Sequence, residues 1–291
     1  MIEIDWAGEA GRLRASAAGE ADWNAAVAGT LVRDTDKVVA DVGCGGGGMA
    51  KALAEARPGA TVVAIDADPD VLAQAREHTG GLVRCELASM DDGAEPLRQA
   101  IAAPADLIWA SASVHHAADQ QAAIDALASL LAPGGRLALA EGGLPARHLP
   151  WDLGIGEPGL ELRLDVAQDR WFKVMRESLP GSVPLPYGWT EALTRAGLTD
   201  VTTRSVLSET PVPLTPERID GVVQGFRTRI ERLTGSGHGH GHFVPQEEWL
   251  TPADLEVWQQ LLDPEGPYFL GRRADLAALS VRSVHIGHAP R

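Results

Sequence analysis

A run of four glycines directly after a short apolar segment is the feature that most constrains how this chain folds. Residues 38–42, Val-Val-Ala-Asp-Val, have the length and β-branched content of a buried strand, and residues 49–56 favour a helix. Between them, Gly43, Gly45 and Gly48 have the G-x-G-x-x-G spacing. Glycine at these positions lets the backbone turn sharply and approach a ligand closely. The segment predicts a strand–turn–helix unit with a ligand at the turn.

Strand and helix patterns alternate on either side of this turn. A helix is expected at 22–32, and strands are expected at 38–42, 61–66, 82–86, 106–110 and 136–141. Helical patterns lie between them at 49–56, 69–78, 94–101 and 119–131, and Ala132-Pro-Gly-Gly is typical of a turn. Five strands separated by helices imply a parallel, doubly wound α/β sheet.

The second half of the chain interrupts this alternation. Helices are expected at 166–178, 190–196, 215–233, 251–262 and 273–279, and strands at 201–207 and 280–286. About 70 residues separate the last two strands, far more than an ordinary loop. We therefore interpret the chain as a single domain over 1–291 with a core at 22–145. Its helical cap comprises 146–186 and 211–280, and its final strands lie within 187–208 and 280–288.

Composition narrows the partners and the compartment. The net charge is −15, from 40 acidic and 25 basic side chains, which disfavours nucleic acid and anionic membrane surfaces. Cys44 and Cys85 are the two cysteines, so a disulfide framework is not expected. No basic-then-apolar leader and no apolar run of membrane-span length are apparent, which predicts a cytoplasmic protein. The alanine- and arginine-rich composition is typical of GC-rich genomes, and we associate it with specialised metabolism.

Five motifs in a fixed order make the chain similar to class I S-adenosylmethionine-dependent methyltransferases of the small-molecule type. They are Asp41-Val-Gly-Cys-Gly, Val62-Val-Ala-Ile-Asp, Asp106-Leu-Ile-Trp-Ala-Ser with Val114-His-His, Leu131-Ala-Pro-Gly-Gly-Arg-Leu, and Leu193-Thr-Arg-Ala-Gly-Leu. The resemblance is strong over 22–145 and weaker over 187–208 and 280–288. It implies a seven-stranded Rossmann-like doubly wound sheet, mostly parallel with the last strand antiparallel. The helical cap would be inserted after strand five and between strands six and seven.

The resemblance also implies a cofactor, S-adenosyl-L-methionine, and the product S-adenosyl-L-homocysteine. It places Asp41 near the ammonium group and Asp66 on the ribose hydroxyls, with the glycine turn against the ribose and the amino-acid end. Leu87 stands before Ala88 where the family usually has an acidic residue, which weakens that adenine contact. The cofactor-binding residues expected are Asp41, Gly43, Gly45, Gly46, Asp66, Ala67, Ala88, Ser89 and Ser111.

Catalysis places fewer demands on the sequence. Methyl transfer needs a base only when the attacking atom is protonated at the working pH. His116, after the fourth strand, and His148, after the fifth, are the candidate bases. The competing interpretations are a structural role for His116 and a surface-loop position for His148. Trp151, Trp171 and Trp189 are candidates for the wall of an apolar acceptor pocket.

A histidine-rich segment offers a metal interpretation that the sequence disfavours. His238, His240 and His242 alternate with glycine, and imidazole suits zinc, nickel or copper. No cysteine or carboxylate is adjacent, so a disordered loop is favoured and no metal site is expected.

The function expected is methyl transfer to an O, N or C atom of a small organic acceptor by a monomer or homodimer, without nucleic-acid or membrane partners. One alternative is a nicotinamide-dependent oxidoreductase, in which Asp66 would bind the adenosine ribose. Another is a non-catalytic or repurposed protein that binds S-adenosylmethionine.

Overall fold

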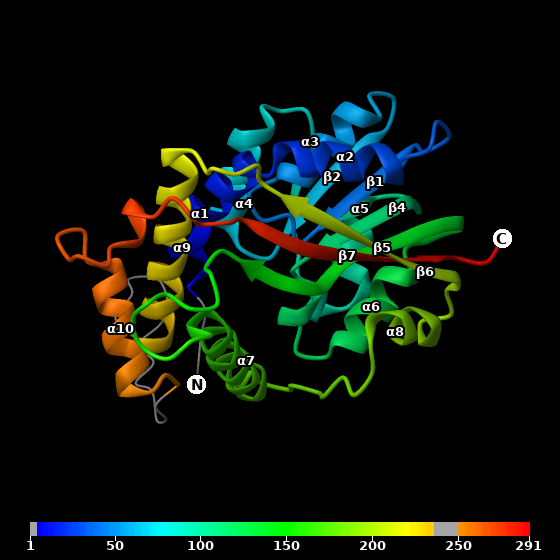
Figure 1. The fold of residues 1–291 in the computed structure, drawn as a ribbon. Helices are drawn as coiled ribbons and strands as arrows, with labels where there is room; N and C mark the ends of the chain where they lie inside the picture. Colours follow the sequence, from blue (N-terminus) through cyan, green and yellow to red (C-terminus); the bar gives the residue numbers. More distant parts are fainter. Residues whose placement is uncertain (1–4, 236–248) are drawn as a thin grey trace. The chain divides into compact units, whose positions relative to one another are not determined.

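The computed structural model describes residues 5–235 and 249–291, and the chain divides into two compact units. The sheet unit comprises residues 5–142, 180–206 and 282–291. The helical unit comprises the described residues of 143–179 and 207–281. Three of the boundaries, at 142/143, 206/207 and 281/282, fall inside the last three strands, and the one at 179/180 follows a helix that ends at Ser178; the residue colours of Figure 1 show where these segments lie along the chain.

Seven strands form one sheet in the order β3-β2-β1-β4-β5-β7-β6. They are β1 (Val38–Val42), β2 (Thr61–Asp66), β3 (Arg84–Leu87), β4 (Ala105–Ser111), β5 (Leu131–Arg147), β6 (Thr199–Glu209) and β7 (Leu279–His288). Strands β1 to β5 pair in parallel, and the last strand is antiparallel. The expected fold class is thus confirmed. The chain order reverses between β1 and β4, which is where ligands bind in open α/β sheets.

The sheet unit contains seven of the described α-helices and the helical unit three. The first group is α1 (Trp6–Gly19), α2 (Ala21–Leu31), α3 (Gly48–Ala56), α4 (Pro69–Thr79), α5 (Ala94–Ile101), α6 (Gln120–Ala128) and α8 (Trp189–Arg195). The second group is α7 (Leu160–Ser178), α9 (Pro216–Thr234) and α10 (Pro252–Leu262). Short 3₁₀ turns are η1 (Met90–Asp92), η2 (Val114–His116) and η3 (Leu270–Arg272).

Alternating side chains of the strands supply two separate cores, one on each face of the sheet. In β2, Val63 and Ile65 pack on the face covered by α5, α6 and α8. Val62 and Ala64 pack on the opposite face, covered by α2, α3 and α4. Figure 1 shows α2 and α3 on one side of these strands and α6 and α8 on the other. The period of two in the sequence therefore produces a sheet covered by helices on both faces.

The helical unit has a hydrophobic core of its own. Trp171 of α7, Phe226 of α9 and Trp258 of α10 are buried in it, and all of its members lie within residues 149–278. None of the helices in the described parts of the chain is both long enough and apolar enough to cross a membrane.

The structure corrects three expectations about elements. Residues 6–19 form α1, which the sequence analysis left without an element. The helix expected at 273–279 is wrong, because this segment follows η3 in extended form and the Ala277 amide donates to the His148 carbonyl (2.9 Å). The helix expected to reach residue 131 ends at Ala128. β5 begins at Leu131, and the Pro-Gly-Gly sequence forms an irregularity in its pairing with β4.

Candidate active site

The turn after β1 is built from glycines with positive φ. Gly43, Gly45 and Gly47 have φ values of 71°, 51° and 76°. The amides of Gly43 and Cys44 donate to the carbonyl of Ile65 in β2 (2.8 and 2.9 Å). A Cβ on Gly43 would lie 2.4 Å from Cβ of Ser113, which follows β4. Positive φ and this close approach together explain why the turn needs glycine.

Helix α1 packs against the same turn. A Cβ on Gly46 would lie 2.4 Å from the carbonyl oxygen of Leu13 in α1. Trp6, at the start of α1, meets the ring of His116 edge-on at 4.9 Å between ring centroids. Gly46, expected to serve the cofactor, is therefore also required by contact with a helix that the sequence analysis missed.

Asp41 is a buried carboxyl group with an unsatisfied oxygen. Its side chain is 2% exposed, and Oδ2 has no hydrogen-bond partner among the described residues. Burial raises the pKa of Asp41 to about 7; a hydrogen bond from the Ala50 amide opposes this rise and the charge of Asp66 adds to it. A buried acid of this kind is stabilised by a cationic partner.

Asp66, at the end of β2, accepts hydrogen bonds from two amides of neighbouring turns. Oδ2 accepts from the Gly45 amide (3.0 Å) and Oδ1 from the Asp68 amide (3.2 Å). Burial raises the pKa of Asp66, although these amides and that of Ala67 act in the opposite direction. Because each carboxylate oxygen has a second lone pair, Asp66 retains the capacity to accept from two ligand hydroxyls.

The residues expected to bind the cofactor all lie at the carboxyl edge of four adjacent parallel strands. Ala88 and Ser89 follow β3, and the Ala88 amide donates to the carbonyl of Asp66 (3.1 Å). Ala67 follows β2 and is exposed, whereas Ser111 ends β4 and is half-buried. The strand order therefore brings together side chains from four separate segments in one unit.

Glu141, which the sequence analysis assigned no role, anchors the loop after β4. Its side chain is 2% exposed. Oε1 accepts from the amides of Ser113 and Val114 (3.0 and 2.9 Å), and Oε2 lies 2.7 Å from Nδ1 of His115. The signal that would have found it is an acid ending the apolar run 137–140, as Asp41 and Asp66 lie in or end theirs.

His148 belongs to the helical unit, whereas His116 belongs to the sheet unit. Nδ1 of His148 lies 3.0 Å from Oε1 of Glu161 in α7, and Oε2 of Glu161 accepts from the Leu149 amide (3.1 Å). Burial raises the pKa of Glu161. Hydrogen bonds from the His148 side chain and from the backbone amides of Leu149 and His148 outweigh this effect and hold the pKa of Glu161 below its usual range. His148 is thus an oriented histidine rather than a free surface side chain.

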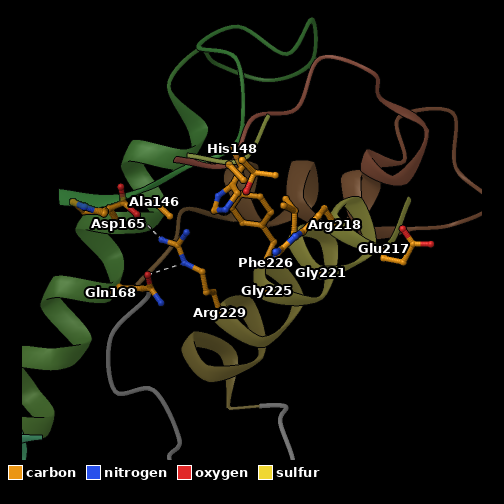
Figure 2. A pocket seen from close by; sticks show the side chains of 14 residues that line it. Ala146, His148, Asp165, Gln168, Glu217, Arg218, Gly221, Gly225, Phe226 and Arg229 are labelled. Atoms are coloured by element: carbon orange, nitrogen blue, oxygen red, sulfur yellow. Dashed lines mark hydrogen bonds and ion pairs between the residues drawn. The ribbon is translucent and has the colours of Figure 1, made fainter. Parts of the chain in front are cut away.

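A cavity of about 550 Å³ lies beside His148 within the helical unit. Figure 2 shows His148 next to Phe226, with Arg229 extending toward Asp165 and Gln168. The lining residues are Pro145, Ala146, His148, Asp165, Gln168, Thr210, Glu217, Arg218, Gly221, Val222, Gly225, Phe226, Arg229 and Ala278. Trp151, Trp171 and Trp189 do not line it. His238, His240 and His242 lie outside the described residues.

Comparison with known proteins shows that the segment containing the glycine turn is similar to methyltransferases. Residues 40–137 match the family described as "Methyltransferase domain". Ubiquinone biosynthesis O-methyltransferase of Xylella fastidiosa is 42% identical over 102 residues, 34% of this chain and 39% of that protein. Trans-aconitate 2-methyltransferase of Klebsiella pneumoniae is 34% identical over 163 residues, 55% of each chain. Residues 40–137 form a class I S-adenosylmethionine-dependent methyltransferase domain.

Solved structures support the fold of the methyltransferase domain and its extensions. The putative methyltransferase of Haloferax volcanii, solved with the activator Trm112, has a TM-score of 0.52 at 16% identity, with 100% of both chains covered. A putative methyltransferase of Bacillus halodurans has a TM-score of 0.50 at 14% identity, covering 94% of this chain and 100% of that chain. The chain spans only 39% of the length of the first curated relatives it matches.

The site fits the cofactor of this family. The unsatisfied oxygen of Asp41 suits a cationic amine, and the remaining acceptor capacity of Asp66 suits vicinal hydroxyls. S-Adenosylmethionine carries both groups and no phosphate. The family match over residues 40–137 therefore favours a methyltransferase over a nicotinamide-dependent oxidoreductase.

Proposed function

We propose that the protein transfers a methyl group from S-adenosylmethionine to an O, N or C atom of a small organic acceptor and releases S-adenosylhomocysteine. The observation that carries this proposal is the pair of carboxyl groups, Asp41 and Asp66, on either side of the glycine turn in the matched domain. Two relatives, named for ubiquinone biosynthesis and for trans-aconitate, give independent support for small-molecule chemistry.

The proposed roles follow from the chemistry of each group. Asp41 would hold the ammonium group, and Asp66 would accept from the ribose hydroxyls. The backbone of Gly43, Gly45 and Gly46 would lie along the ribose and the amino-acid end. Ala67, Ala88 and Ser89 would contact the adenine, and Ser111 would lie beside the methyl group. When bound, the cofactor supplies a methyl group on a sulfonium, which is a good leaving group, so the chain mainly has to orient the acceptor and exclude water.

His116 and His148 are the proposed bases for an acceptor that carries a proton on the attacking atom. With Nδ1 of His148 donating to Glu161, Nε2 is the nitrogen that would take up the proton. His116 packs against Trp6, so its proposed role requires the α1 contact to leave one ring nitrogen accessible. An acceptor that is already an anion would need neither histidine.

The net negative charge of the chain limits the partners that it would bind. At −15, its surface would repel nucleic acid and anionic lipid, so the partner we propose is the small acceptor, met in the cytoplasm by a monomer or homodimer.

Cofactor binding provides the test, with a matched control at the opposite edge of the sheet. Asp66 accepts from two backbone amides at the carboxyl edge, and Asp106 accepts from those of Lys37 and Val38 (2.8 and 3.0 Å) at the amino edge. We expect Asp66→Ala to weaken S-adenosylhomocysteine binding at least 100-fold, because two hydrogen bonds to a charged group contribute roughly 3 kcal/mol. Asp106→Ala should lose comparable stability and bind normally. Calorimetric titration measures both, and equal affinities would contradict the ribose assignment.

A further inference from the structure

One face of α9 lines the cavity of the helical unit and carries two glycines. Arg218, Gly221, Val222, Gly225 and Arg229 follow one another at three- or four-residue helical spacing, with Val222 next to Gly221. A Cβ built on Gly221 or Gly225 would meet no described atom within 4 Å. Alanine would therefore fit at both positions in the free protein.

Glycine inside a helix is unfavourable unless something requires it. Its backbone loses more conformational freedom on folding than that of alanine, so each glycine weakens the helix. Neither glycine of α9 is explained by a neighbouring part of the described chain or by a positive φ. Close approach of a ligand to the helix backbone is the remaining requirement that glycine meets.

Two arginines offset the two acids of the cavity lining in a protein that is strongly acidic as a whole. Asp165 accepts from both Arg147 and Arg229, so this group of three carries one net positive charge. Arg218 makes no side-chain hydrogen bond or ion pair with any described residue. Glu217, at the first turn of α9, is the other acid of the lining, and hydrogen bonds with its own backbone amide and with Thr215 lower its pKa. The four charged lining residues, Asp165, Glu217, Arg218 and Arg229, therefore sum to zero, against −15 for the whole chain, and Arg147 adds a positive charge behind Asp165.

The positive groups adjoin an apolar wall. The guanidinium carbon of Arg229 lies 5.6 Å from the ring centroid of Phe226, and the ring of His148 meets Phe226 edge-on at 5.4 Å. Gln168 accepts from Nε of Arg229 (2.7 Å) and fixes the guanidinium, as Figure 2 shows. No partner of Arg229 Nη1 is recorded in the described chain, so a guanidinium edge is available to an incoming anion.

We propose that this cavity binds a small organic carboxylate, with its anionic group on Arg218 and Arg229 and its apolar body against Phe226 and the bare backbone of Gly221 and Gly225. The assignment of this carboxylate as the methyl acceptor rests on the proposed function. The binding of a carboxylate in this cavity does not depend on that function. The volume of about 550 Å³ lies within the range of small-molecule sites.

Binding of neutral and charged isosteres to the whole protein tests the charge requirement. Benzoate, cinnamate and 3-phenylpropionate are titrated by ligand-observed NMR, each beside its carboxamide. We expect at least one carboxylate to bind at least tenfold more tightly than its amide. Arg218→Gln should remove this preference, whereas Arg170→Gln, an exposed arginine of α7 that does not line the cavity, should retain it. Absence of binding by all three acids, or equal affinity for acids and amides, would overturn the proposal.

The glycines give a test in which stability and binding change in opposite directions. Gly225→Ala should raise Tm by roughly 2–4 °C, because alanine favours the helix, and weaken carboxylate binding at least tenfold. Gly29→Ala in α2, where a Cβ also meets nothing within 4 Å, should raise Tm and leave binding unchanged. A stabilised Gly225→Ala protein with unchanged carboxylate affinity would overturn the proposed contact with the backbone.

Titration with S-adenosylhomocysteine separates this inference from the proposed function. Cofactor binding without carboxylate binding would overturn the carboxylate site alone and leave methyl transfer in place. Carboxylate binding without cofactor binding would overturn methyl transfer and keep the site. Methylation of the bound carboxylate would establish it as the acceptor.

Discussion

Three acids lie in or at the end of β1, β2 and β5, and the structure satisfies each to a different degree: Asp41 and Glu141 are buried, and Asp66 is half-buried. Glu141 accepts two amides and contacts His115, and Asp66 accepts two amides but keeps free lone pairs. Asp41 has an oxygen with no partner in the described chain. Glu141 therefore has the hydrogen bonds of a structural acid, whereas Asp66 and Asp41 keep acceptor capacity that the described chain does not use.

Asp41 gives the ligand-free protein an unusual pH dependence. Its pKa is about 7 when folded and about 3.9 when unfolded, so the folded state binds the proton more tightly. As pH rises from about 4 to about 7 the unfolded state ionises first, and the free energy of unfolding falls by roughly 4 kcal/mol in all. We expect Asp41→Asn to remove this slope and to be the more stable protein at pH 7 without cofactor. Urea denaturation at pH 4.5, 6 and 7.5 measures it, and parallel curves for the two proteins would contradict the prediction.

At the scale of elements, α1 is the part of the site that the sequence hides. Its sequence, Trp-Ala-Gly-Glu-Ala-Gly-Arg-Leu-Arg-Ala-Ser-Ala-Ala-Gly, has no apolar period, so nothing in it predicts a buried face. Small side chains instead allow its backbone to approach the glycine turn, where a Cβ on Gly46 would clash with Leu13 and one on Gly48 would lie 3.0 Å from Cβ of Ala17. We infer that contact with the turn helps to hold the helix in place.

Two substitutions separate the contribution of the contact between α1 and the turn from that of the helix propensity of α1. Gly46→Ala places a methyl group 2.4 Å from the Leu13 carbonyl, so we expect α1 to be displaced and stability to fall by about 1–3 kcal/mol. Gly11→Ala, inside α1 with nothing within 4 Å of its Cβ, should instead stabilise the helix by about 0.5–1 kcal/mol. Hydrogen exchange of residues 6–19 should accelerate only in the first variant. Unchanged exchange there would show that α1 is not held by the turn.

The elements that the sequence predicts best are those bounded by strong local signals. β1 and β2 have the bounds expected, because apolar runs end at a glycine turn and at an Asp-Pro helix start. Asp68 caps α4, since it accepts from the amides of Asp70 and Val71 (2.9 and 3.0 Å). The helix expected at 273–279 does not form, and the Ala277 amide instead donates to the carbonyl of His148, a residue distant in sequence.

The candidate site also contains residues that the sequence predicted and residues that it did not. Asp41 and Asp66 were predicted from the resemblance to methyltransferases, whose motifs lie at strand ends that parallel pairing brings together. Glu141 was missed because its partners, the amides of 113 and 114, become neighbours only when β5 pairs with β4. The cavity beside His148 was missed because α7 and α9 supply its charged lining from segments about 50 residues apart.

At the scale of the whole molecule, the two units have separate hydrophobic cores. The core of the helical unit draws on α7, α9 and α10, and those of the sheet unit draw on the strands and the helices beside them. Separate cores are a condition under which parts of a chain can open independently.

Because the two units have separate hydrophobic cores, we expect a bound ligand to protect from amide hydrogen exchange only the unit that binds it. A ligand that binds only the native state slows local opening of its own unit, by about 100-fold at 100 times its Kd. We expect S-adenosylhomocysteine to slow amide exchange in β1, β2 and the turn at 43–48, and to leave α7 and α9 near their ligand-free rates. Hydrogen exchange with mass spectrometric detection measures both sets of segments in one sample, and Asp66→Ala supplies a control without cofactor binding. Equal protection across both units would mean that they open as one cooperative body despite their separate cores.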